Sequence, residues 1–431
     1  RYDRDTLASD ALAAAIVTLM LIPQSLAYAT LAGLPAEVGL YASIAPLLLY
    51  AVFGTSRVLA VGPVAVVSLM TATAIAPHAA AGTAAYLNAA LVLALLSGGV
   101  LVLMGLLRLG ALAQFLSHPV MAGFITASAV LIAIGQLPAL LGLKVSGDGA
   151  IARLLDLLSH LDRIHPATAV MGGLTLLFLF WARRGLKPLL VRLGLSPRAA
   201  ELLARAGPVA GIAATAAVTA LAGLHTQGVA IVGTVPQGLP SASLPAFDVA
   251  LWQQLALPAL LIGVVGFVES VSVGQTLASR RRQRIDPDRE LVALGASNLG
   301  AAVTSGMPVT GGFARSVVNF DAGAQTPAAG VFTAAGIALA AWLLTPALYF
   351  IPQATLAATI VVAVVSLVDL SVFRRTWAYS KADFASAAVT VVFTLVEGVE
   401  AGLIAGVALS LLLYLHRTSR PHTAEVGRVP G

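Results

Sequence analysis

The chain has 431 residues, of which 58% are hydrophobic and only 10% are charged, and its formal net charge is +6. This balance lies far outside the range of soluble domains and predicts an all-α integral membrane protein. The lack of cysteine excludes a disulfide framework, a thiolate metal site and a cysteine nucleophile. No polybasic arm with interleaved aromatic residues is present, so we expect no nucleic-acid partner.

The apolar runs of the chain predict its membrane segments. The first ten residues are too polar for a signal peptide, so the first apolar segment is expected to remain as a spanning helix. Runs long enough to cross a bilayer lie at 8–32, 86–107, 119–141, 166–182, 207–223, 256–277, 327–345 and 397–415, and shorter or interrupted runs at 38–53, 62–76, 291–304, 307–320, 353–368 and 383–396. Together they make fourteen transmembrane segments.

The first two segments contain polar residues that suit a cavity or a relay. Pro23 frees a backbone carbonyl in the first span, and Gln24 beside it can donate two hydrogen bonds, so we expect Gln24 to line a cavity. Tyr28, one turn further, either joins it or packs in the core. Glu37 opens the second span, as a carboxylate stabilised at a helix N-terminus or as a proton relay at the outer mouth.

Two segments are broken by proline and glycine at matching places in the chain. The third span of the first seven follows Pro63, and the third span of the second seven follows Pro308, Gly311 and Gly312. Broken backbone survives in a membrane only where protein or a water-filled cavity surrounds it. Matched breaks indicate a transporter site between inverted repeats. The two short helices would point their N-termini at each other, which favours an anion.

Arg315 lies at the start of the second broken helix, and Glu269 lies in the middle of the eighth span. Arg315 either acts on the anion or forms a structural ion pair with Glu269, and the two roles are compatible. Intramembrane ionisable groups are functional by default. Glu269 is either a proton-coupling group or a structural counter-ion. Glu397 and Glu400, at the outer end of the last helix, receive no function.

Charge and amphipathicity indicate how the segments are oriented. With both termini in the cytoplasm, all lysines and arginines lie on the cytoplasmic side except Lys144, Arg153 and Arg163, which fall outside, and Arg315, which falls within a span. Residues 149–165 show helical spacing of apolar positions and are expected to form an interfacial helix on the outer surface. The polar tail 417–431 is typical of a linker into a soluble C-terminal domain.

Several long motifs in the same order show that the chain resembles the SulP family of sulfate permeases and anion exchangers. They are "IPQSLAYATLAGLPAEVGLYAS", "VGPVAVVSLM", "DRELVALGASNLGAAVTS" and "GGFARSVVNFDAGAQTPAAG". The resemblance implies a 7+7 inverted repeat with a core domain in 1–110 and 250–347, a gate domain in 111–230 and 348–416, and a linker in 417–431. It also implies a cytoplasmic STAS domain beyond the linker, through which the full-length protein would form a homodimer.

The resemblance further implies an anion site between the starts of half-helices three and ten, lined by spans one and eight. The residues expected there are Gln24, Tyr28, Val64, Ala65, Phe313, Ala314, Arg315 and Ser316. The expected proton-coupling carboxylates are Glu269, in span eight, and Glu37, at the outer mouth. Many family members carry a serine before the arginine, so Ala314 lacks one hydroxyl donor. Some sodium-coupled members use an aspartate and a threonine in span eight. Glu269 and Val273 stand there in this chain, which favours protons over sodium.

The sequence therefore predicts a secondary active transporter of small anions of the sulfate, bicarbonate or dicarboxylate class, driven by proton symport or by exchange. It would span the plasma (inner) membrane many times, with both termini cytoplasmic and with the lipid bilayer and protons as partners. An uncoupled anion channel of the same fold is the main alternative. A nucleobase–proton symporter is disfavoured by Arg315, and an enzyme by the lack of a catalytic set. No histidine has zinc-ligand spacing, so we expect neither metal nor cofactor.

Overall fold

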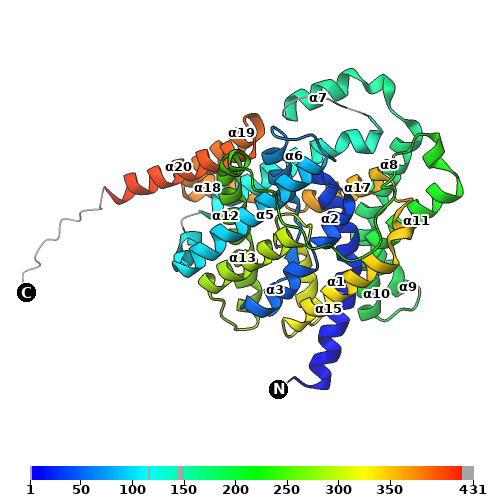
Figure 1. Cartoon of the computed structure of the whole chain (residues 1–431), viewed down its shortest axis with the longest axis horizontal. Helices are drawn as coiled ribbons and strands as arrows, with labels where there is room; N and C mark the ends of the chain where they lie inside the picture. Colours follow the sequence, from blue (N-terminus) through cyan, green and yellow to red (C-terminus); the bar gives the residue numbers. More distant parts are fainter. Residues whose placement is uncertain (1, 115–116, 144, 146–149, 420–431) are drawn as a thin grey trace, which may run out of the picture.

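Helices make up most of this computed structural model, which describes residues 2–114, 117–143, 145 and 150–419 (Figure 1). Lys144 and most of the predicted linker, residues 420–431, lie outside the described residues. Residue 149, where the interfacial helix was expected to begin, lies outside them as well. The strands found in the described part, β1 and β2, have two residues each and pair with one another.

The elements of the first half follow the predicted segments closely. They are α1 (Arg4–Leu31), α2 (Ala36–Tyr41), α3 (Ala45–Phe53), β1 (Val61–Gly62), α4 (Ala65–Ile75), α5 (Ala84–Leu106), η1 (Leu109–Gln114), α6 (His118–Leu141), α7 (Ala150–Ser159), η2 (Leu161–Arg163), α8 (Pro166–Trp181), the π-helical turn η3 (Ala182–Leu186), α9 (Lys187–Arg192), α10 (Pro197–Arg205), α11 (Gly207–Leu221) and η4 (Leu224–Gln227).

The second half repeats the pattern of a long helix, a second helix and a short strand before a short helix. Its elements are α12 (Val249–Arg280), α13 (Pro287–Val303), β2 (Thr310–Gly311), α14 (Phe313–Asp321), α15 (Ala328–Leu343), α16 (Thr345–Leu348), α17 (Gln353–Val365), α18 (Ser371–Tyr379), α19 (Lys381–Val396) and α20 (Val399–Thr418). Both leading helices, α1 and α12, contain an internal proline, Pro23 and Pro258.

Each of the fourteen predicted segments coincides with a helix or a pair of helices. In the described residues, seven helical stretches are long and apolar enough to cross a membrane, namely Arg4–Leu31, Ala36–Phe53, Ala84–Leu106, His118–Leu141, Pro166–Arg192, Val249–Arg280 and Val399–Thr418. Ala199–Arg205 and Gly207–Leu221 form an eighth candidate, bent by 52°. Fourteen complete crossings therefore stay a prediction. The amphipathic segment is helical in α7 and η2 and packs on α6 and α19.

Elements from the two halves of the chain interleave rather than forming separate bodies. Helix α5 packs against α12 and α13, and α3 packs against α13 and α15. In the same way, α6 contacts α17 and α19, and α17 contacts α8. Figure 1 shows α1 running through the interior, with α15 and α17 from the second half beside it. This interleaving brings the two broken segments together.

Candidate functional site

The two extended lead-ins pair as an antiparallel ribbon inside the helical bundle. Val61 lies opposite Gly311 and Gly62 opposite Thr310, and the Gly312 N–H donates to the Ala60 carbonyl at 3.1 Å. The ribbon is needed because extended backbone in a membrane protein must find hydrogen-bond partners within the protein. It places the start of α4 beside the start of α14. The half-helices with extended lead-ins expected from the sequence are present.

Both half-helices begin without a side-chain cap. The N-cap residues are Val64 for α4 and Gly312 for α14, and neither makes a side-chain hydrogen bond to its helix. The first N–H groups of a helix have no partner within it, and together with the helix dipole they form a partial positive charge. Two such ends that meet in one place create a region that suits a negatively charged group.

Arg315 joins the two half-helices. The side chain is 3% exposed, and its Nη2 donates to the carbonyls of Gly62 at 2.8 Å and Pro63 at 2.6 Å. No carboxylate oxygen of the described residues lies within 4.0 Å of the guanidinium. The direct ion pair with Glu269 that the sequence left open is therefore absent here. Backbone carbonyls hold the guanidinium while its charge stays uncompensated at short range.

A cavity of about 550 Å³ opens in front of this arrangement. Seven of the eight residues expected to bind substrate line it, namely Gln24, Tyr28, Val64, Ala65, Phe313, Ala314 and Arg315, together with the proposed coupling residue Glu269. They come from α1, α4, α12 and α14. The Glu269 side chain is half-buried in the wall, and no hydrogen bond or ion pair to it is found among the described side chains.

Ser316 does not line the cavity, which corrects its predicted place, and Glu37, predicted at the outer mouth, does not line it either. The Ser316 hydroxyl donates to the Gly312 carbonyl at 2.7 Å and accepts from the Ala60 N–H at 3.0 Å, so it fastens β1 to α14 and cannot reach an anion. Glu37 lies in the first turn of α2, away from the cavity-lining residues. A carboxylate at a helix N-terminus accounts for that position.

A pair of hydroxyls also supports the ribbon, one of them from α12. Ser270, the residue after Glu269, accepts the Gly311 N–H at 2.8 Å, and its hydroxyl lies 2.7 Å from that of Thr310. Both side chains are buried. The helix that carries Glu269 is thereby attached directly to the lead-in of α14. Sequence reasoning missed this pair because Ser270 and Thr310 are common residues with no spacing signal.

Sequence reasoning also missed the charged residues at the far end of the cavity. Arg183, Lys187, Glu201 and Arg205 line it on the side of η3, α9 and α10. In the sequence, the basic residues after the sixth span indicate orientation only. Their meeting with the cavity depends on how α8 to α11 fold over α14, which no local pattern reports.

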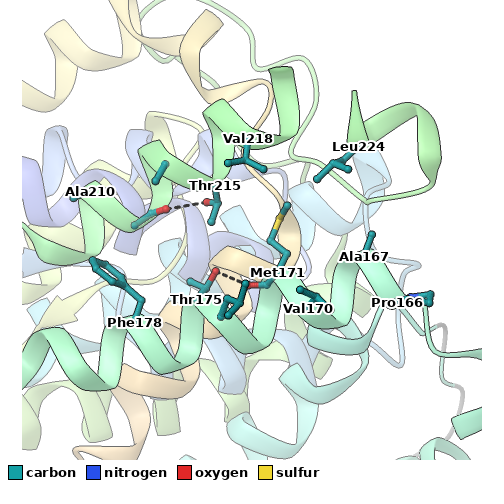
Figure 2. A pocket seen from close by; sticks show the side chains of 13 residues that line it. Pro166, Ala167, Val170, Met171, Thr175, Phe178, Ala210, Thr215, Val218 and Leu224 are labelled. Carbon is teal, nitrogen blue, oxygen red and sulfur yellow. Dashed lines mark hydrogen bonds between the residues drawn. The ribbon is translucent and has the colours of Figure 1, made fainter. Parts of the chain in front are cut away.

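A separate cavity of about 770 Å³ lies between α8 and α11 (Figure 2). Its walls are apolar, and its two hydroxyls are used within their own helices. Thr175 donates to the Met171 carbonyl at 2.7 Å, and Thr215 donates to the Gly211 carbonyl at 3.0 Å. Because this cavity offers an anion no free donor and no charge, the Arg315 cavity is the candidate site.

The chain matches a known protein family over most of its length. Residues 7–390 match the family model described as the Sulfate permease family. The chloroplastic sulfate transporter 4.1 of Arabidopsis thaliana is 37% identical over 98% of this chain, and the match covers 60% of that protein. The chain thus spans less than two thirds of the length of this relative.

Two solved structures share the fold. The murine anion transporter Slc26a9, in the inward-facing state, is similar with a TM-score of 0.86 at 24% identity, over 97% of this chain and 70% of that one. The transmembrane domain of BicA, a bicarbonate transporter from a cyanobacterium, gives 0.78 at 21% identity, over 94% of this chain and 98% of that one. The helical membrane-protein fold expected from the sequence is confirmed.

Proposed function

Because this chain belongs to the sulfate permease family, we propose that it is a secondary active transporter of small anions of the sulfate, bicarbonate or dicarboxylate class. The observation that carries the proposal is the meeting of two uncapped half-helix starts with Arg315, in front of a cavity. The N–H groups at the starts of α4 and α14 would bind the anion oxygens. Arg315 would supply a full positive charge behind them.

The backbone carries most of this recognition. Ala314 has no hydroxyl, and the Ser316 hydroxyl is used by backbone groups. Backbone amides can donate to any oxyanion of suitable size, so the site suits a class of anions. The Arg315 Nη2 is bound to the Gly62 and Pro63 carbonyls. The guanidinium therefore acts on the anion through its field and through the shape that it gives the two helix starts, while its buried Nη1 has no hydrogen-bond partner among the described residues and is left to donate.

Glu269 is the proposed coupling group. It faces the cavity without a hydrogen-bond or ion-pair partner among the described residues, close enough to Arg315 for electrostatic interaction. A divalent anion beside one arginine and one ionised glutamate would leave a net charge of about −2 in a poorly solvated place. Proton uptake by Glu269 would reduce this net charge from about −2 to about −1. Binding of the anion and the proton would then be mutually favourable, as symport requires.

The cavity lies where two sets of helices meet, which supports alternating access. One wall comes from α1, α4, α12 and α14, which belong to the proposed core domain (1–110 and 250–347). The other comes from η3, α9, α10, α11 and α17, which belong to the proposed gate domain (111–230 and 348–416). A movement of the first set against the second would carry the anion between the two membrane faces. The cytoplasmic termini, the plasma-membrane location and a homodimer through a STAS domain beyond 417–431 belong to the same proposal.

An uptake screen in proteoliposomes tests this function. Labelled sulfate, bicarbonate and a dicarboxylate are offered with and without an inward proton gradient, to wild type, Arg315→Ala and Glu269→Gln. We expect a proton-stimulated uptake of at least one anion, a loss of about tenfold or more in Arg315→Ala, and loss of proton stimulation in Glu269→Gln. Arg163→Ala and Glu400→Gln are matched controls, because both residues lie away from the cavity.

Two results would contradict the proposal at different points. Normal transport of every tested anion by Arg315→Ala would show that the proposed anion site is wrong. Full uptake without a pH gradient, by wild type and Glu269→Gln alike, would instead favour the uncoupled channel. Thermal melting of each purified variant shows whether a loss of uptake reflects the site or the fold.

A further inference from the structure

The far end of the cavity carries an excess of positive charge. Arg183, Lys187 and Arg205 line it, with Glu201 as the carboxylate among its lining residues there. This end lies on the connection between α8 and α11, where the side chains of Lys187 and Glu201 are 50% and 45% exposed. The cavity therefore reaches solvent at this point, and an anion that travels to Arg315 from this side must pass these charges.

Two of the three cations already take part in ion pairs. Glu201 accepts from Lys187 Nζ at 2.8 Å and from Arg205 Nη2 at 2.8 Å. Arg205 also reaches Asp321, at the C-terminal end of α14, at 3.2 Å. The chain of charges alternates in sign, and the paired cations have little capacity left for a passing anion. Within the described chain, no hydrogen bond or ion pair engages Arg183.

The local backbone explains how Arg183 comes to face the cavity. It lies in the π-helical turn Ala182–Leu186, between α8 and α9. Such turns insert an extra residue into a helix and are frequent at functional sites. Gly185 lies directly against Trp181 in this turn. A Cβ at this position would lie 2.5 Å from the indole Nε1, so a larger residue would not fit there without a shift. Arg183 and Arg184 are both exposed, but only Arg183 lines the cavity.

Arg183, Tyr28 and Arg315 line one cavity. Arg183 is exposed, in the turn between α8 and α9, whereas Arg315 is 3% exposed at the start of α14. An anion that enters beside Arg183 therefore reaches Arg315 without leaving the cavity. A positive charge at the mouth of a low-dielectric cleft raises the local concentration of anions and their rate of entry.

We propose that Arg183 is a transit site, a specificity-determining cation on the gate side that receives the anion from solution and passes it to the Arg315 site. This inference rests on the proposed function and extends it to the mouth of the cavity. Arg183 selects by charge, because its contribution is proportional to the charge of the anion. At about 6 Å in water, one unit charge is worth a factor of about 3 for a monovalent anion and about 10 for a divalent one.

The test compares Arg183→Gln, Arg183→Lys and Arg184→Gln in inside-out and right-side-out membrane vesicles, so that one face is presented at a time. The probes are radiolabelled sulfate and bicarbonate. At the face where the cavity opens, we expect kcat/KM of Arg183→Gln to fall about tenfold for sulfate and about threefold for bicarbonate. Arg183→Lys should retain at least half of the wild-type value. Arg184→Gln, which removes the same charge one residue away, should also stay within about twofold of wild type.

Ionic strength and anion charge separate a transit site from a structural role. Microscopic reversibility ties kcat/KM in the two transport directions, so Arg183→Gln must lower it by the same factor from both faces. An impermeant salt added at the face where the cavity opens should narrow the deficit, whereas the same salt at the opposite face should not. A deficit that salt leaves unchanged, or an equal deficit for sulfate and bicarbonate, would overturn the inference. Active wild type with an unaffected Arg183→Gln would overturn the transit site alone. Wild type that carries neither probe, nor the dicarboxylate of the uptake screen, would overturn the proposed function with it.

Discussion

Gly312→Ala should displace the Arg315 guanidinium while leaving the fold in place. Gly312 is the N-cap of α14, with an extended backbone (φ −84°, ψ 132°) that alanine adopts readily. A Cβ there would lie 2.9 Å from Arg315 Nη2 and 3.0 Å from Cζ, with Nε nearer still. The obstruction is the end of a flexible side chain, so the guanidinium must move by about 1 Å to restore ordinary contact.

The size of the effect follows from that displacement. Nη2 is held by carbonyls at 2.8 and 2.6 Å, and a shift of about 1 Å breaks hydrogen bonds of such length. For a divalent anion at about 4 Å and an effective dielectric constant of about 20, retreat of the charge to about 5 Å costs about 1.7 kcal/mol. Anion affinity should therefore fall roughly 15-fold. The free energy of unfolding should fall by about 1 kcal/mol, because alanine is a poorer N-cap than glycine.

The assay measures kcat/KM for anion uptake beside the melting temperature of each purified variant. Gly99→Ala in α5 is the control, because a Cβ there meets no atom within 4 Å. We expect it to transport like wild type and to be as stable or slightly more so. A folded Gly312→Ala protein with wild-type kcat/KM would refute the view that the position of the guanidinium sets anion binding.

Two further predictions concern stability. Glu290 is 1% exposed and accepts from the Tyr50 hydroxyl at 2.7 Å, the Thr55 N–H and hydroxyl at 2.8 and 2.6 Å, and the Ser56 N–H at 3.1 Å. Glu290→Gln should therefore lower the free energy of unfolding by about 2–4 kcal/mol. A melting temperature within 2 °C of that of the exposed control Arg289→Gln would contradict this. The Ser371 hydroxyl and N–H hold the pKa of Asp369, on the α17–α18 turn, below its usual range. Its stabilising contribution is therefore present above about pH 4, the ordinary aspartate pKa, and is lost as pH falls through the lowered value. Asp369→Asn should melt slightly below wild type at pH 6, the gap should shrink as the pH is lowered below about 4, and a gap that does not change with pH would refute the assignment.

The membrane segments could be predicted because they depend on local composition. Apolar runs delimit α1, α5 and α12, and the glycines and prolines around Pro63 and Pro308 report that extended backbone precedes two short helices. The location of Arg315 beside a helix start follows from the same local signal. A chain in a bilayer must satisfy its backbone hydrogen bonds, so breaks in apolar runs carry information.

The partners of the functional groups could not be predicted, because they come from distant segments. Arg315 is held by the carbonyls of Gly62 and Pro63 and not by Glu269. Every residue has a backbone carbonyl, so the sequence does not mark these two as partners. The hydroxyl of Ser316 faces the ribbon because α14 is rotated to place Arg315 there. Arg183 lines the cavity because a π-helical turn changes its direction, and a run of basic residues does not report such a turn.

The pairing of β1 with β2 has a consequence for biosynthesis. Val61 and Gly311 are about 250 residues apart in the chain. At about 5–20 residues per second, the ribosome needs roughly 12–50 s to deliver the second strand after the first. During that interval the extended backbone before α4 is already in the membrane without its partner, where unpaired N–H and C=O groups are costly. The nascent first half must therefore be sheltered by water, by the insertion machinery or by a temporary contact, until the second half arrives to complete it.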